Sequence, residues 1–341
     1  MSDLEIEECI LSKDTNRALE LCTKGQKYFL GLFIKQFDEN FVDRSAPVIR
    51  IMLVCNWCTT EQLVNLWNKM SKGNFTWNNI QIVMNEPADY YVVINSAPKE
   101  IVIDPKKTIV FRMEPHMDKN PIQWGEWANP DSDKFLKIFK HANKEYNNIE
   151  WHLSKTYQEL STMKIEKNPE FDSIISTVLS AKYKDPGHVK RIDFVRFLEK
   201  KGMKMHVYGD NKWNYKDYKG SLPYHCKDQA IFPYKYIFNA ENHNIDSYFT
   251  EKLVDGILGE CLVFYYGCFN IKEYLDERAF VHLELSNFEK DYEIITRAIK
   301  EDWHSKRLPY IREAKKKILE DMQFFPRLEK IINQFKTENS A

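Results

Sequence analysis

The feature that most constrains the fold is a repeated alternation of short apolar runs with helical or polar segments. In the first half of the chain these runs are residues 48–54, 80–83, 90–94 and 108–113. In the second half they are residues 174–179, 205–208, 236–240, 262–266 and 280–285. Strands that alternate with helices form parallel, doubly wound sheets. The sequence therefore predicts an α/β protein with two sheets and a cleft between them.

Helical segments and changes in composition divide the chain into four parts. The segments predicted as helices between the strands are residues 60–70, 188–201, 248–258 and 291–299. Residues 158–170, enriched in Lys, Glu, Asn and Pro, are predicted to be a linker, and residues 148–154 one more strand. The four parts are a helical extension (1–46), a first Rossmann-like domain (47–160), a second Rossmann-like domain (161–304) and C-terminal helices (305–341) interrupted at Pro326.

The composition excludes several classes of function. The 341 residues include 49 basic and 50 acidic ones, a formal charge of -1, so no overall attraction to nucleic acid is expected. The seven cysteines are irregularly spaced, which favours a reduced intracellular protein. The acidic N-terminus lacks the apolar run of a secretory signal, and no transmembrane segment is expected. We therefore expect a cytoplasmic protein, with a weak attraction of its basic C-terminal helices to anionic membranes left open.

Residues that follow strands are the candidate site, because ligands of open α/β sheets bind beyond the carboxyl ends of the strands. Glu114 follows one such run, and either a general base or a solvated carboxylate fits that position. Residues 180–191 lead from another strand into a helix that carries Lys190 and Arg191. A helix N-terminus and an arginine fork suit a phosphate group, although a basic solvated face fits the same residues.

The third strand end is the richest in polar groups. After Ala240 the chain reads Glu-Asn, a five-residue loop, and then Tyr-Phe-Thr-Glu-Lys-Leu at the start of an apolar helix. Asp246 and Ser247 are the N-cap candidates of this helix. Lys252 lies in the first turn, where the helix dipole disfavours a cation. This placement suits a helix start that binds phosphate, with an ordinary capped helix and a solvated lysine as the alternative.

This segment resembles the donor-binding motif of the α-1,3/4-fucosyltransferase family. The motif pairs Glu-Asn with a Tyr-x-Thr-Glu-Lys sequence after a short loop, and Ala240 replaces the usual phenylalanine before the pair. The similarity extends to residues 180–198 and 205–209, and Glu114-Pro115 resembles the family's catalytic Glu-Ser-Pro segment without its serine. The resemblance covers about residues 48–300, and residues 1–46 have no counterpart.

The resemblance implies the GT-B architecture, with two Rossmann-like domains facing a cleft. Residues 47–160 would take the acceptor, residues 161–304 the GDP-sugar donor, and residues 305–341 would cross back to the first domain. The implied reaction is an inverting transfer of L-fucose from GDP-fucose to a hydroxyl of a glycan acceptor, with Glu114 as the catalytic base.

The resemblance also implies the residues that bind the donor. They are Arg191, Glu241, Asn242, Tyr248, Glu251 and Lys252. Arg191 and Lys252 would neutralise the departing diphosphate, so neither a divalent metal nor another cofactor is expected. Tyr248 and Asn242 would bind phosphate or sugar, and Glu251 the ribose hydroxyls. The glutamate of the Glu-Asn pair would orient the loop or face the fucose.

Several alternatives stay open. The chain could use another nucleotide sugar, such as another GDP-hexose, or be a non-catalytic GT-B module that binds glycan or nucleotide. Asp131-Ser132-Asp133 has the form of a metal–nucleotide motif, but is expected to cap a helix over residues 134–141. Cys55 and Cys58 form a Cys-x-x-Cys pair that follows a strand, for which redox and metal roles are the weaker readings. His243, beside the donor motif, is a further candidate ligand contact. The acceptor and the oligomeric state are not indicated.

Overall fold

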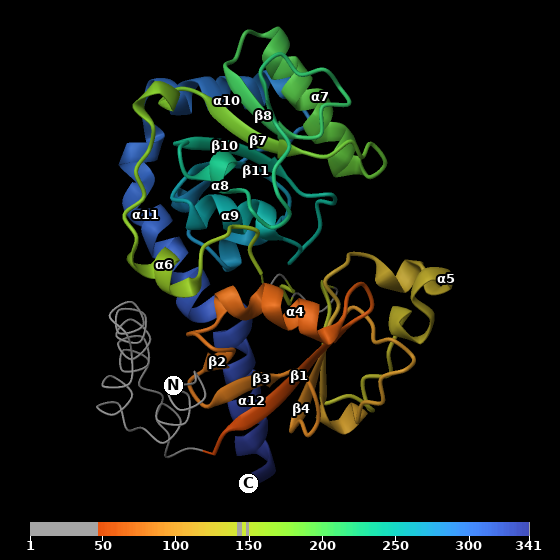
Figure 1. The fold of residues 1–341 in the computed structure, drawn as a ribbon. Helices are drawn as coiled ribbons and strands as arrows, with labels where there is room; N and C mark the ends of the chain where they lie inside the picture. The colour runs from red at the N-terminus through yellow and green to blue at the C-terminus, as the bar shows by residue number, and fades with distance from the viewer. Residues whose placement is uncertain (1–46, 142–144, 148–149, 341) are drawn as a thin grey trace, which may run out of the picture. The chain divides into compact units, whose positions relative to one another are not determined.

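A computed structural model describes residues 47–141, 145–147 and 150–340 (Figure 1). The helical extension predicted for residues 1–46 lies outside the described residues. The described chain from Ile49 onward is one compact unit that contains two sheets. No helix within these described ranges is long and apolar enough to cross a membrane.

The first sheet has six strands in the order β2-β3-β1-β4-β5-β6. Its strands are β1 (Ile49–Cys55), β2 (Thr76–Trp77), β3 (Ile80–Val83), β4 (Tyr90–Ile94), β5 (Thr108–Phe111) and β6 (Lys137–Phe139). All neighbours pair in parallel except β2 and β3. Because β1, β4 and β5 are almost wholly buried, their sequences are continuous apolar runs, as expected for central parallel strands.

The second sheet has six strands in the order β12-β11-β10-β7-β8-β9, all parallel. Its strands are β7 (Ile175–Leu179), β8 (Met205–Gly209), β9 (Tyr218–Gly220), β10 (Tyr236–Ala240), β11 (Leu262–Tyr266) and β12 (Phe280–His282). The strand order reverses direction between β10 and β7. Loops that leave two such neighbouring strands diverge to opposite faces of the sheet, which opens a crevice at their carboxyl ends.

Helices lie between the strands of both sheets and also follow the last strand, β12 (Figure 1). They are α4 (Thr60–Trp67), α5 (Pro121–Trp124), α6 (Tyr157–Thr162), α7 (Pro186–Lys200), α8 (Asp228–Ile231), α9 (Glu251–Leu258), α10 (Phe288–Lys300), α11 (Trp303–Lys317) and α12 (Phe324–Ser340). Both α7 and α9 lead away from the carboxyl ends of strands, so their N-termini lie at the crevice of the second sheet.

The helix expected over residues 134–141 is wrong, because β6 occupies its middle. Residues 137–139 pair in parallel with residues 109–111 of β5, and the ring of Phe139 stacks on that of Phe111 at 4.9 Å. Asp131 therefore caps no helix. Its carboxylate accepts the Asp133 N–H and pairs with Lys134, which closes a turn before the strand.

Four smaller expectations also differ from the structure. Residues 151–154 form no strand, and the fully buried Trp151 donates its indole N–H to the Lys155 carbonyl instead. The linker contains α6, which begins at a capping box formed by Thr156 and Glu159. Residues 211–228, expected from their polar composition to form a loop, contain β9. The break in the C-terminal helices falls at Gln323, because a proline is tolerated in the first turn of a helix.

The last helix, α12, packs against elements of the first sheet. The rings of Phe324 and Trp67 lie 5.1 Å apart, and those of Phe325 and Trp77 lie 6.0 Å apart. The Glu329 carboxylate accepts hydrogen bonds from the Trp77 indole and from the side chain of the next residue, Asn78. The end of the chain thus supplies part of the core around the first sheet.

Candidate functional site

A cavity of about 200 Å³ opens at the carboxyl ends of β7 and β10. Leu179 and Ser180 border it at the end of β7, and Asn239 borders it from β10. Arg191 of α7 and the first turn of α9 complete much of its wall. We call this space the β7–β10 cavity. Its position between strands where the sheet order reverses is where α/β sheets bind ligands.

The first turn of α9 is fixed by a buried carboxylate. Glu241 is fully buried, and its two oxygens accept the N–H and the hydroxyl of Thr250, each at 2.8 Å. Thr250 is the N-cap of α9, and its hydroxyl oxygen accepts the Lys252 N–H. The prediction that Asp246 or Ser247 caps this helix is therefore wrong, since Thr250, which Glu241 binds, is the N-cap.

Lys252 extends from this turn to the wall of the β7–β10 cavity. Its Nζ lies 3.1 Å from the Thr250 hydroxyl, 3.2 Å from Glu251 and 3.6 Å from Glu241. Desolvation raises the pKa of Glu241, and the charge of Lys252 opposes that rise. The ammonium is thus held at the helix start by two carboxylates and a hydroxyl.

Hydrogen bonds to residues that follow β7 and β10, or end β10, hold Arg191 at the cavity wall. Its guanidinium donates to the Ala240 carbonyl at 3.1 Å, to the Asn242 side chain at 3.0 Å and to the Ser180 hydroxyl at 3.3 Å. Its buried Nε has no hydrogen-bond partner among the described residues. Desolvation lowers the pKa of Arg191, and the nearby Glu241 opposes the change.

Gly187 allows α7 to approach the Glu-Asn segment this closely. A Cβ at position 187 would lie 1.8 Å from the Glu241 carbonyl oxygen, and the Gly187 N–H donates to the Asn242 carbonyl at 2.9 Å. Only glycine fits this contact, so the position of Arg191, one turn further along α7, depends on it.

Lys227 and Asp255 belong to the site although sequence reasoning missed them. Both line the β7–β10 cavity, and Lys227 Nζ lies 2.9 Å from Asp255 and 3.3 Å from Glu251. Burial lowers the pKa of Lys227, but the two carboxylates outweigh it and raise the pKa above its usual value. Burial raises the pKa of Glu251, but Lys252 and Lys227 outweigh it and hold that pKa well below its usual range. Glu251 is therefore ionised at neutral pH.

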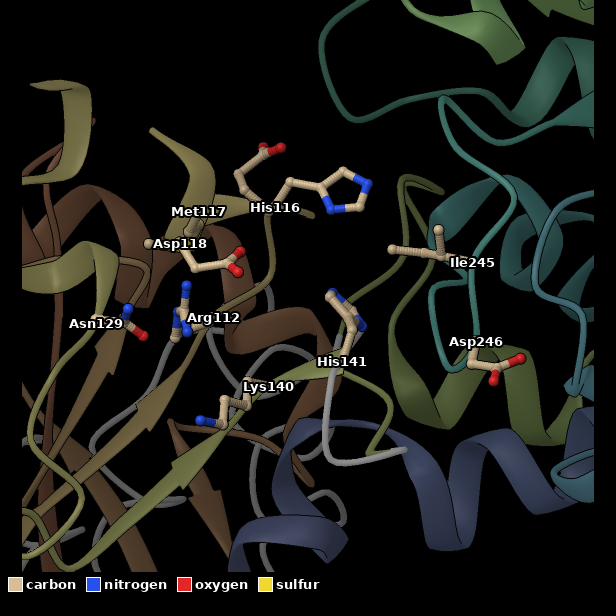
Figure 2. A pocket seen from close by; sticks show the side chains of 10 residues that line it. Arg112, His116, Met117, Asp118, Asn129, Lys140, His141, Ile245 and Asp246 are labelled. Carbon is tan, nitrogen blue, oxygen red and sulfur yellow. The ribbon is translucent and has the colours of Figure 1, made fainter. Parts of the chain in front are cut away.

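A second cavity, of about 340 Å³, contains Glu114 and is called the Glu114 cavity (Figure 2). Figure 2 shows Arg112, Lys140 and His141 on its first-domain side, with Ile245 and Asp246 of the second domain opposite. The imidazole of His141 lies between backbone oxygens of both parts, 3.2 Å from that of Met113 and 3.1 Å from that of Ser247.

Glu114 stands three residues beyond the end of β5. The side chain of Asn95 accepts the N–H groups of Met113 and Glu114, which fixes the chain as it leaves the sheet. Desolvation by the cavity walls raises the pKa of the Glu114 carboxyl, while the charges of Lys252 and Lys182 oppose the rise. The raised pKa makes this carboxylate a stronger base than a fully solvated glutamate.

The structure brings some of the expected site residues together and separates others from the cavities. Arg191, Glu251 and Lys252 line the β7–β10 cavity, and Glu114 lines the second one. The three remaining residues, Glu241, Asn242 and Tyr248, line neither. The first two hold α9 and Arg191 in place, as described above. Tyr248 is buried, with its ring 5.2 Å from that of His141.

The surroundings of the Cys-x-x-Cys pair and of His243 do not indicate a functional role for either. Cys55 and Cys58 are thiols whose sulfur atoms lie 3.4 Å apart. Desolvation and the bond to Cys55 raise the pKa of Cys58 to about 12, whereas redox cysteines have a lowered pKa. His243 packs against the ring of His116 at 5.2 Å, and it lines neither cavity.

Two Rossmann-like sheets with a cavity at the carboxyl ends of the second make up the GT-B architecture. A solved α1,3-fucosyltransferase structure aligns with 84% of this chain and 93% of its own, at 15% identity and a TM-score of 0.51. The match with a GDP-fucose complex has a TM-score of 0.43, at 15% identity over 84% of this chain and 94% of that one. A glycosyltransferase from Rickettsia africae ESF-5 aligns at 12% identity and a TM-score of 0.48, over 85% of this chain and 98% of that one.

A family model identifies the second domain. Residues 172–302 match the C-terminal domain of glycosyltransferase family 10, the fucosyltransferases. The match covers the second domain alone, and it identifies the protein as a glycosyltransferase. No curated protein matches the chain by sequence.

Proposed function

We propose that this chain is an inverting fucosyltransferase that moves L-fucose from GDP-fucose to a hydroxyl of a glycan acceptor. The observation that carries the proposal is the placement of Lys252 on the wall of the β7–β10 cavity, inside the matched fucosyltransferase domain. A cation at the positive end of a helix dipole suits the diphosphate of a nucleotide sugar.

The donor would bind in the β7–β10 cavity. Lys252 and the N-terminus of α9 would neutralise the diphosphate as it leaves, and Arg191 would add its charge from the cavity wall. The ionised Glu251 is a suitable acceptor for the ribose hydroxyls. Because these cations supply the positive charge that a metal often provides, we propose that transfer requires no divalent metal.

The acceptor would bind in the Glu114 cavity. The Glu114 carboxylate would take the proton of the acceptor hydroxyl while that oxygen attacks C1 of fucose. The bond from C1 to the diphosphate breaks in the same step, GDP leaves with the electron pair, and the configuration at C1 inverts. The raised pKa of Glu114 supports this role, since a carboxylate with a higher pKa is the stronger base.

The test is thermal unfolding of the full chain with GDP, GDP-fucose, GDP-mannose, UDP-galactose and UDP-N-acetylglucosamine in parallel, without metal. A ligand at about 100 times its Kd stabilises by roughly 2.7 kcal/mol, which raises the unfolding midpoint by a few degrees. We expect a shift with GDP and GDP-fucose that disappears in Lys252→Ala. Lys200→Ala, at the exposed far end of α7, is the matched control and should keep the shift.

The other outcomes separate the alternatives. A shift with UDP sugars alone would reject fucose and retain a glycosyltransferase with another donor. No shift with any nucleotide would favour a non-catalytic module. If donor binding is found, incubation with GDP-fucose and candidate glycans, followed by NMR of the anomeric carbon, shows whether the product is the inverted α-fucoside.

A further inference from the structure

A cluster of metal-ligating side chains lies outside both cavities. Glu150, His152 and His225 each place one ligand atom within 4.8 Å of the others. His152 Nε2 lies 3.4 Å from a Glu150 oxygen, and the rings of His152 and His225 are 3.7 Å apart between centroids. The first two residues precede α6, whereas His225 lies in the loop before α8, 73 positions after His152 in the sequence. Tertiary folding therefore assembles the cluster.

His225, one of the three residues of this cluster, has an unsatisfied polar atom. Its buried Nδ1 has no hydrogen-bond partner within the part of the chain that the structure describes. The residue also has a φ of 51°, the left-handed conformation that side chains larger than glycine rarely adopt. Burying an unpaired nitrogen costs free energy, so a group that binds this nitrogen would remove a penalty that the protein alone leaves.

The surroundings hold the other two ligands in position. The second oxygen of Glu150 accepts the indole N–H of Trp67 at 2.8 Å. His152 Nδ1 lies 4.0 Å from Glu251, so a carboxylate faces the ring nitrogen opposite the one near Glu150. A carboxylate behind a ligating imidazole is the usual outer partner of a protein metal ligand, because it fixes the ring and raises its basicity.

One backbone hydrogen bond joins the two segments that carry the ligands, and a second fastens the first segment to α9. The His152 N–H donates to Asp255 at 2.7 Å, and the Lys227 N–H donates to the His152 carbonyl at 2.9 Å. The two segments are thus held at the spacing that the cluster requires without help from an ion.

We propose that Glu150, His152 and His225 bind one zinc ion. Two imidazole nitrogens and one carboxylate oxygen are a donor set that zinc accepts in four-coordinate sites, with water in the fourth position. The same set also accepts Fe²⁺ in enzymes that react with oxygen, and the test below separates the two metals. The ion would fasten residues 150–152 to the loop that carries His225. Through His152 it would also fix Glu251 at the edge of the β7–β10 cavity.

This ion is distinct from the metal that other glycosyltransferases use against a diphosphate, since its ligands line neither cavity. The proposal does not depend on which nucleotide sugar binds. Zinc binding and donor binding are therefore measured separately, and either can fail without the other.

The test measures zinc content and zinc affinity of the full chain. The protein is stripped with a chelator, dialysed and titrated with zinc chloride against a chromophoric competitor, and bound metal is counted by elemental analysis. We expect one zinc per chain, and a loss of affinity of at least about 100-fold in His225→Ala and His152→Ala. His282→Ala removes an exposed histidine at the end of β12 and should leave affinity unchanged.

Thermal unfolding shows whether the variants remain folded. Zinc should raise the unfolding midpoint of the stripped wild type and of His282→Ala, and should leave that of His225→Ala unchanged. Wild-type protein that takes up no zinc overturns the proposal whatever the variants do. Zinc affinity that survives in a folded His225→Ala overturns it too, and so does Fe²⁺ binding that zinc cannot displace.

Discussion

Lys227 neutralises two carboxylates at the β7–β10 cavity, so its replacement by methionine tests whether this network stabilises the fold. Its ammonium lies 2.9 Å from Asp255, which is 1% exposed, and 3.3 Å from Glu251. At an effective dielectric constant of about 20, the two attractions amount to about 6 and about 5 kcal/mol. Desolvation of the charges offsets most of this. Removing one partner nevertheless leaves buried carboxylates uncompensated, which costs about 3–5 kcal/mol.

We therefore expect Lys227→Met to lower the thermal unfolding midpoint by about 6–10 °C, at roughly 2 °C per kcal/mol for a chain of this size. Lys164→Met is the matched control, because Lys164 and its partner Glu166 are exposed and such pairs contribute about 1 kcal/mol or less. Adding Asp255→Asn to Lys227→Met should recover part of the loss, since the amide oxygen still accepts the His152 N–H without carrying a charge.

The pH dependence of the unfolding midpoint provides a second check on the role of Lys227. Because its neighbours depress the pKa of Glu251, its charge stabilises the folded state above the unfolded pKa of about 4.3, and this contribution is lost as pH falls through the folded value. The difference in unfolding midpoint between wild type and Lys227→Met should therefore become smaller as the pH is lowered. Equal midpoints for Lys227→Met and Lys164→Met would refute the reasoning, as would a double variant less stable than Lys227→Met.

Two further predictions concern catalysis and helix packing. Glu114→Gln should lower kcat by a factor of about 10²–10⁴ while GDP binding persists. In the pH–rate profile of the wild type we expect an acid limb with a midpoint above about 4.3, and the variant should lack it. That limb rises with pH because only the carboxylate accepts a proton. Glu126→Gln, outside the cavity, is its control, and an unchanged pH–rate profile in Glu114→Gln would exclude the base. Gly187→Ala should cost about 1–3 kcal/mol and weaken GDP binding, because its Cβ would force α7 away from Glu241. The unfolding midpoint and the GDP affinity of this variant are measured beside those of Lys184→Ala, an exposed control. Values for Gly187→Ala equal to those of wild type would count against the argument.

Several strands could be predicted from sequence because their runs are mostly apolar and mostly buried. The expected ranges 80–83, 90–94, 236–240 and 262–266 coincide with β3, β4, β10 and β11. The strand β6 was missed because it is short, lies at the edge of its sheet and begins with a lysine. It pairs with β5, which lies about 25 residues earlier, and the local pattern of apolar residues does not indicate such a pairing.

The residues of the site also divide into those that the sequence predicts and those that it does not. Arg191 and Lys252 could be predicted because each lies in a helix that follows a strand, and Glu251 because the motif that contains it resembles that of a known family. Lys227 was missed because it lies 28 residues from Asp255 and only folding brings the two together. The expected N-cap was wrong for a related reason, since the residue that selects Thr250 is a glutamate nine positions earlier.

The packing of α12 on the first sheet has a consequence during synthesis of the chain. Trp77 and its partner Glu329 are separated by 252 residues. At about 5–20 residues per second, a ribosome needs about 13–50 s to translate that distance. Throughout this interval the tryptophans that α12 later covers have no native partner on that side. The nascent protein therefore displays an apolar surface until α12 has been synthesised, and shielding by a chaperone would matter most for its first sheet.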